Sequence, residues 1–127
     1  ARLGIEPVDE TPRATDETNL AAMAAMIRQL EARGHTYRSD GSIYFKIATL
    51  SGYGKLARLD HEGIQAGARV DVDEYTKEDA RDFVLWKAAG EGRVLKWPSP
   101  WGDGYPGWHV ECSAMARRYL GDRFDIH

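Results

Sequence analysis

Apolar residues recur at helical spacing in the first third of the chain. The four that share one face of the predicted helix are Leu20, Met23, Ile27 and Leu30. Thr15 or Asp16 can cap this helix, acidic residues follow in its first turn, and Gly34 ends it. Such a stripe, completed by alanine and methionine, is far more often core packing than a binding surface. We therefore predict a core-packing helix, preceded over residues 1–15 by a polar, proline-containing, extended lead-in.

Two β-prone runs follow the helix within residues 35–47. They lie on either side of the tripeptide Ser39-Asp40-Gly41. An Asp-Gly step supplies the positive φ that a tight hairpin turn requires. This segment therefore predicts a small β-hairpin.

A third strand is predicted further along the chain, over residues 82–89. The sequence there, DFVLWKAA, is a continuous apolar run suited to a buried strand, and Gly90 and Gly92 end it. The stretch between the hairpin and this strand is rich in glycine and charge. It predicts loops and one short helix near Asp60 to Gln65.

The segment 96–108 concentrates tryptophan, proline and glycine, a composition typical of a rigid loop. Pro106 stands where a helix can begin, and Gly121 where it can end. Larger side chains recur on one face of that predicted helix, at spacings of four, three and four: Trp108, Cys112, Met115 and Tyr119. The last residues, Phe124–His127, predict a final strand.

Composition places the chain among soluble globular proteins, with 127 residues, 43% hydrophobic and 29% charged residues. No apolar run approaches the roughly 18 residues that cross a bilayer, and the start lacks a signal-peptide layout. One cysteine cannot form an internal disulfide, so we expect a reducing compartment, the cytoplasm. The net charge of −3 gives no overall basic field, so charge does not decide whether the chain binds RNA.

Cys112 is the first candidate for chemistry. It lies about one turn into the predicted helix, where the partial positive charge of free backbone amides favours a thiolate, either a ligand or a nucleophile. Spacing alone favours the alternative of a buried cysteine acting as a small apolar residue. His109, three residues earlier, could join Cys112 in a metal site or an acid-base pair. The other histidines are scattered, so we predict no self-contained four-ligand zinc site.

A run of four aromatic residues is the second candidate. Its members, separated by glycine and proline, are Trp97, Trp101, Tyr105 and Trp108. Flat rings on a stiff loop can stack a base or form the wall of a substrate pocket, and they can equally form a small core. No basic residue lies between Trp97 and Trp108, which makes nucleic-acid stacking the weaker interpretation.

Longer strings resemble a known family. SPWGDGYPGWHVECSAM (99–115), with GARVDVDEYTKEDARDFVLWKAAGEG (67–92) before it and LGDRFDIH (120–127) after it, resembles the cysteinyl-tRNA synthetases in order and spacing. Upstream, PRATD, ARGHTY, GSIYF and YGKL match the same family, so the resemblance covers nearly the whole chain.

The resemblance implies an α/β fold, part of a split, Rossmann-like class I catalytic domain with a connective insertion of helices and short β-hairpins. Residues 16–127 would then comprise that insertion and the beginning of the second catalytic half. The H-I-G-H signature that handles ATP would precede Ala1, and the K-M-S-K-S loop and the anticodon-binding helices would follow His127. We therefore expect this piece alone to form no cysteinyl-adenylate.

The resemblance also implies a site. In the family, the cysteine at the position of Cys112 is one of four zinc ligands. The others are a cysteine of the first half and a downstream histidine and glutamate. Trp108 and His109 match pocket residues that contact the substrate, and no catalytic residue is assigned. Zinc, cysteine, ATP and tRNA(Cys) are the implied cofactor, substrates and partner. With one ligand, the isolated piece should bind zinc weakly or not at all, and its exposed apolar surface should favour self-association.

Two alternatives remain. A related ligase, which joins cysteine to an amino sugar in mycothiol synthesis, shares the PGWH-[IV]-EC string, although DFVLWK and SPWG favour the tRNA enzyme. A free-standing binding module is the other, and the abrupt end at DIH argues against it. One departure from the family is Tyr105, which stands where relatives often have arginine, so any contact of that arginine is in doubt.

Overall fold

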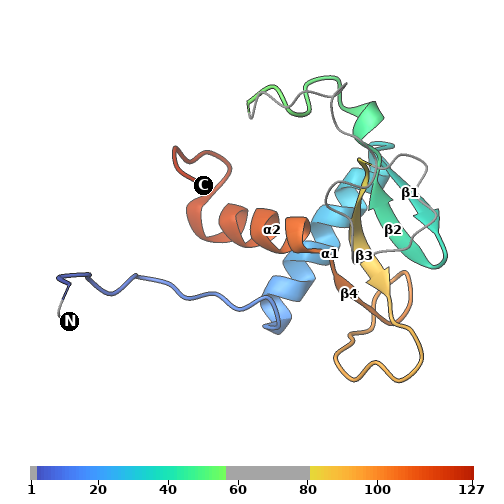
Figure 1. Ribbon diagram of the computed structural model, residues 1–127, viewed down its shortest axis with the longest axis horizontal. Coiled ribbons are helices and arrows are strands. Elements are labelled where there is room, and N and C mark those ends of the chain that lie inside the picture. Colours follow the sequence, from blue (N-terminus) through green and yellow to red (C-terminus); the bar gives the residue numbers. More distant parts are fainter. Residues whose placement is uncertain (1–2, 57–80) are drawn as a thin grey trace.

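The computed structural model describes residues 3–56 and 81–127. Its elements, in chain order, are α1 (Glu17–Ala32), β1 (Thr36–Ser39), β2 (Ser42–Phe45), the 3-10 turn η1 (Ile47–Thr49), β3 (Phe83–Ala88), β4 (Gly104–Pro106) and α2 (Trp108–Leu120). The strands form one antiparallel sheet in the order β1-β2-β3-β4. The two helices pack against each other beside this sheet (Figure 1). The chain is thus α/β as predicted, and the sheet pairings described are all antiparallel.

The first helix follows its predicted boundaries. Asp16 is the N-cap residue of α1, although its side chain makes no capping hydrogen bond. The predicted apolar face is the buried one, since Leu20, Met23 and Ile27 are at most 9% exposed. In the described part of the chain, neither helix combines the length and apolar character needed to cross a bilayer.

The predicted hairpin is confirmed as β1 and β2. Asp40 and Gly41, at its tip, have φ values of 46° and 75°, so both adopt the left-handed conformation that the Asp-Gly step favours. The strand predicted over residues 82–89 is confirmed as β3, which pairs with β2. The short helix predicted near Asp60 to Gln65 lies outside the described residues.

Two predictions about the last third of the chain are wrong, that of a loop throughout residues 96–108 and that of a final strand at residues 124–127. The segment predicted as a rigid loop contains β4, and Pro106 ends that strand, so α2 begins at Trp108. The helix buries Val110 and Ala114, whereas the face with Trp108 and Cys112 is exposed. Residues 124–127 form no strand. A strand needs a partner edge, and none of the described strands pairs with these residues.

Asn19 joins the start of α1 to two other parts of the chain. It is 1% exposed. Its amide nitrogen donates to the carbonyl oxygen of Arg13 at 2.8 Å, and its amide oxygen accepts from Arg118 of α2 at 2.6 Å. One buried side chain therefore ties the lead-in to both helices.

We predict that Asn19→Ala lowers the free energy of unfolding by about 2 kcal/mol, because it removes two hydrogen bonds made by a buried side chain, one of them to a charged group. Gln29→Ala is the matched control, since the exposed Gln29 accepts only a 3.4 Å hydrogen bond from Arg117 of the same helix α2. It should change stability by less than about 0.5 kcal/mol. Thermal denaturation of both variants tests this, and equal losses would contradict a special role for the buried amide.

Candidate functional site

The start of α2 is fixed by glycines packed tightly against β3. The N–H of Gly107 donates to the carbonyl oxygen of Leu85 at 2.9 Å. A Cβ at Gly107 would overlap the carbonyl oxygen of Val84, and one at Gly104 would overlap the backbone of Lys87. The chain can therefore pass this close to the sheet only where side chains are absent. These two glycines set the position at which the next residues leave the sheet.

Trp108 and His109, the predicted substrate contacts, come directly after this close approach. Trp108 is 86% exposed. His109 is also exposed, and its ring lies against that of Phe83, with centroids 4.4 Å apart and planes inclined by 54°. Phe83 in turn stacks on Phe45 of β2 at 5.1 Å. The structure thus presents both residues at the surface, and it supports the imidazole from one side.

Cys112 is an exposed free cysteine. The interpretation as a buried structural cysteine is therefore wrong. On α2 it stands one turn after Trp108 and three residues after His109, so these side chains are neighbours on the helix surface. The thiol is accessible to a ligand.

A single thiolate fits one position in the coordination sphere of a soft metal such as zinc. Within residues 3–56 and 81–127, no group of three or more histidine, cysteine, aspartate or glutamate side chains is placed to hold a metal ion. From the described residues, Cys112 is therefore a candidate for one ligand rather than the centre of a complete site.

Glu111 is adjacent to Cys112 in sequence but half-buried. Desolvation by burial raises the pKa of its carboxyl group above the ordinary value. Consecutive residues of a helix point in different directions, so the side chains of Glu111 and Cys112 do not lie on the same face of α2. Glu111 is therefore not a candidate partner for the thiol.

The aromatic run does not form one stacking platform. The ring of Trp101 lies 5.9 Å from that of the buried Trp86, and its indole N–H donates to Glu31 of α1 at 2.9 Å. Trp97 also packs against the core, and its backbone pairs with Gly104. Trp97 and Trp101 therefore belong to the core and do not form a stacking surface, whereas Trp108 is exposed.

Tyr105 has cationic neighbours that the sequence did not suggest. The guanidinium of Arg93 lies 3.5 Å from the centroid of its ring, and the ammonium of Lys87 lies 5.8 Å away. The Nε of Arg93 also donates to the carbonyl oxygen of Leu95 at 3.0 Å. The guanidinium of Arg93 therefore lies over Tyr105, at the position where relatives often have an arginine.

We predict that Arg93→Ala lowers the free energy of unfolding by about 0.5–1 kcal/mol, because a cation over an aromatic ring contributes this much at an exposed site. Lys96→Ala is the control, since its ion pair with Asp103 is exposed and spans 3.1 Å without an aromatic partner. A thermal melt of each variant provides the measurement. A melting temperature for Arg93→Ala equal to that of the unaltered protein would contradict the stacking.

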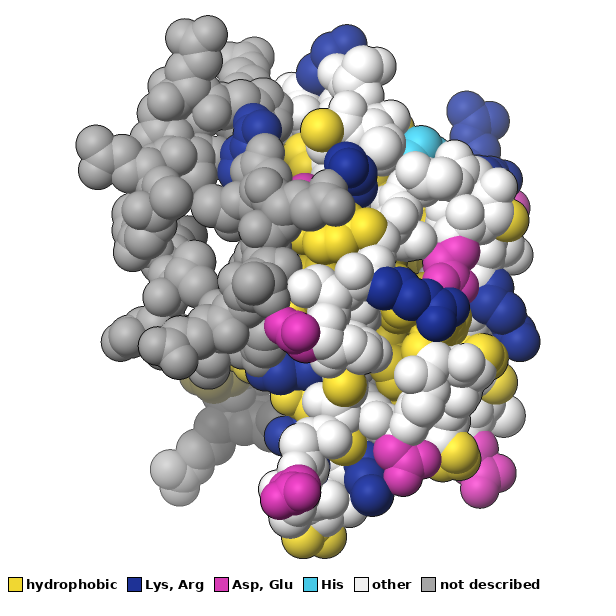
Figure 2. Space-filling model, turned by 90° about the vertical axis from the view of Figure 1, so that its right-hand side faces the viewer, with side chains coloured by type: hydrophobic (Ala, Val, Ile, Leu, Met, Phe, Trp, Pro, Cys, Tyr) yellow, Lys and Arg dark blue, Asp and Glu magenta, His cyan; other side chains and the backbone are white. Residues whose placement is uncertain are grey.

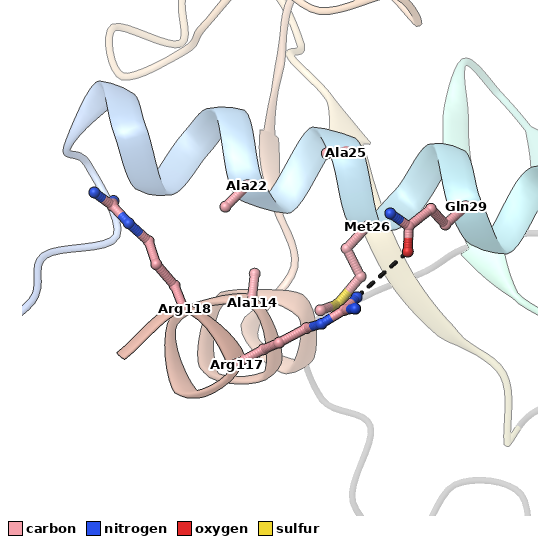
Figure 3. Close-up of a pocket in the computed structure, with 7 residues that line it drawn as sticks. All are labelled: Ala22, Ala25, Met26, Gln29, Ala114, Arg117 and Arg118. Atoms are coloured by element: carbon pink, nitrogen blue, oxygen red, sulfur yellow. Dashed lines mark hydrogen bonds between the residues drawn. The ribbon is translucent and has the colours of Figure 1, made fainter. Parts of the chain in front are cut away.

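A hollow of about 300 Å³ lies between α1 and α2, and two consecutive arginines of α2, Arg117 and Arg118, help to line it. Arg117 donates a hydrogen bond to Gln29 across the hollow (Figure 3). Arg117 also bonds to Asp122 at 2.6 Å, and Arg118 bonds to Asn19. Both guanidinium groups are thus engaged in joining the helices. On the face in Figure 2, basic and acidic side chains of the described residues are interspersed, so these residues create no extended field of one sign there.

Comparison with known proteins agrees with this architecture. The model of the family described as the tRNA synthetases class I (C) catalytic domain matches residues 1–127. A cysteine–tRNA ligase of Halorhodospira halophila is 53% identical over 126 residues, covering 98% of this chain and 27% of the relative. Ligases of the same name from Chlorobaculum tepidum and Thermus thermophilus are 48% and 50% identical, over 99% and 91% of this chain and 26% and 24% of their own lengths.

The chain thus spans about a quarter of the length of these relatives. The family match extends over all of the elements described above, including the close approach at Gly107 and the exposed residues of α2. The chain belongs to the family of class I tRNA synthetase (C) catalytic domains.

Proposed function

We propose that this chain is part of a cysteine–tRNA ligase, which activates cysteine with ATP and transfers it to tRNA(Cys). The observation that carries the proposal is the exposed thiol of Cys112, one turn from the exposed Trp108, in a chain about half identical to ligases of that name. Residues 16–127 would be the connective insertion and the start of the second catalytic half, with 1–15 as the lead-in. The compartment would be the cytoplasm.

Each site residue has a role in this proposal. The Cys112 thiolate is one ligand of a zinc ion, and its surface position leaves it accessible to ligands from other parts of the ligase. Trp108 and His109 contact the amino-acid substrate beside it. When bound, zinc would favour the soft thiolate of cysteine over the hydroxyl of serine, which is a poor ligand at neutral pH. Discrimination of this kind can replace an editing site.

Residues 1–127 by themselves are expected to lack the activity proposed for the whole ligase. We expect no adenylate formation and no tight zinc binding from them, because one thiolate does not replace a four-ligand site. We also expect them to self-associate. Chromatography of the isolated piece as a clean monomer would contradict that expectation.

ATP–pyrophosphate exchange by the whole protein tests the proposed function. Exchange should depend on cysteine and be negligible with serine, and purified tRNA(Cys) should then be charged. Transfer of cysteine to an amino-sugar inositol acceptor, without charging of tRNA, would instead support the related ligase of mycothiol synthesis. Failure to activate cysteine in any form would overturn both ligase assignments and favour the binding module.

A further inference from the structure

The His109 imidazole combines an exposed position with a defined support. In the described part of the chain, the contact found for this side chain is that with the Phe83 ring, at 4.4 Å between centroids. An exposed side chain without such a contact would sample several rotamers. The tilted arrangement of the two rings, at 54°, is one that aromatic pairs prefer. Phe83 therefore restricts the directions in which the imidazole can point.

Phe83 is itself held on two sides. It is the first residue of β3 and the cross-strand partner of Phe45, whose ring stacks on it with an inclination of 17°. Tyr53 contributes a further ring at 6.2 Å. Asp82, the residue before Phe83, is buried and accepts a hydrogen bond from the backbone N–H of Ile47 at 2.9 Å. Phe83 is thus a rigid support rather than a mobile surface ring.

The backbone of His109 is tied to the same strand. Two residues earlier, Gly107 bonds to Leu85 of β3 and approaches that strand too closely for a side chain. Both partners of the ring contact are therefore anchored to β3. What remains free is rotation of the His109 side chain, and Phe83 limits it.

We propose that Phe83 is a positioning residue, which orients the His109 imidazole toward the amino-acid substrate. The inference rests on the proposed function, since it assumes that His109 contacts cysteine. An aromatic contact of this kind biases the orientation by about two- to tenfold. Loss of the Phe83 ring should therefore raise KM for cysteine by about that factor, with kcat and KM for ATP unchanged.

The test uses the whole ligase with the variants Phe83→Leu and Phe83→Tyr. Leucine keeps an apolar side chain but removes the ring, whereas tyrosine keeps the ring and should restore the unaltered KM. Tyr53→Leu is the matched control, because Tyr53 belongs to the same cluster and its ring contacts are with Phe45 and Phe83. It should change KM for cysteine much less than Phe83→Leu does, because Phe45 still stacks on Phe83.

The His109→Ala background separates positioning from a general structural effect. If Phe83 acts through His109, Phe83→Leu should raise KM no further once the imidazole is gone. An equal increase in both backgrounds would overturn the proposal. So would an unchanged KM in Phe83→Leu alone.

Nuclear magnetic resonance of labelled histidine gives a readout that does not need activity. The ring current of Phe83 should shift the His109 ring protons, and Phe83→Leu should remove that shift while Tyr53→Leu keeps most of it. An unchanged His109 spectrum in Phe83→Leu would overturn the orienting contact. If the unaltered protein lacked cysteine-dependent exchange but showed this shift, the proposed function would fail and the positioning of the imidazole would stand.

Discussion

Cys112→Ser is expected to lower cysteine activation by the whole ligase on the order of 100-fold, while the melting temperature stays almost unchanged. Changes to groups that merely support a metal ligand already cost 10- to 100-fold, so replacing the ligand should reach at least the upper end. Stability should change by less than about 0.5 kcal/mol, because the Cys112 side chain is exposed and is not among the residues that pack in the described core. Cysteine-dependent ATP–pyrophosphate exchange and a thermal melt measure the two effects.

Ser113→Ala is the matched control for that experiment. Ser113 is the next residue of α2 and is likewise exposed, but it points in another direction from the helix. Its loss should leave exchange within about twofold of the unaltered rate. Unchanged exchange in Cys112→Ser would remove the thiol from the proposed site, and a large drop in its melting temperature would show that the thiol supports the fold instead.

Gly107→Ala should be the most destabilising single change in the described part of the chain that adds one carbon. The added Cβ would overlap the carbonyl oxygen of Val84, and this atom belongs to a strand paired on both sides. The backbone must move, and overpacking of this kind costs about 3 kcal/mol. The melting temperature should fall by about 10 °C.

Gly90→Ala controls for the general effect of replacing glycine. A Cβ at Gly90, just after β3, would meet no heavy atom within 4 Å, and its φ is not positive. This variant should melt within about 2 °C of the unaltered protein. If Gly107→Ala melted as high as Gly90→Ala, the close approach that positions Trp108 and His109 would be refuted.

Elements determined by nearby residues could be predicted from the sequence. The hairpin depends on the Asp40-Gly41 turn between two short β-prone runs, and α1 depends on its apolar period and on Gly34. These signals lie within a few residues of the structure that they specify. The family strings likewise gave the fold class, which the family match confirms.

Features determined by distant partners could not be predicted in the same way. β4 has three residues and exists because it pairs with β3, so a local composition suggesting a loop concealed it. The buried face of α2 depends on where α1 and β3 lie. They cover Val110 and Ala114, although the larger side chains of α2 lie on a different face of the helix.

The candidate site shows the same division. The string around Cys112 pointed to Trp108, His109 and Cys112 by resemblance, and their roles stay a prediction, whereas spacing suggested that the thiol was buried. Its exposure follows from the packing of the opposite side of α2. Phe83 could not be identified beforehand, because its contact with His109 joins a strand to a helix that are far apart in the sequence. Arg93 was missed as well, because its contact joins the connection between β3 and β4 to Tyr105 of β4.

X-ray absorption at the zinc edge tests the central claim most directly, because it counts the sulfur atoms bound to the metal. We expect the whole ligase to show zinc–sulfur distances of about 2.3 Å. In Cys112→Ser, refolded with zinc, the sulfur count should fall by one while the protein keeps its melting temperature. A sulfur count that is the same with and without the Cys112 thiol would contradict the account.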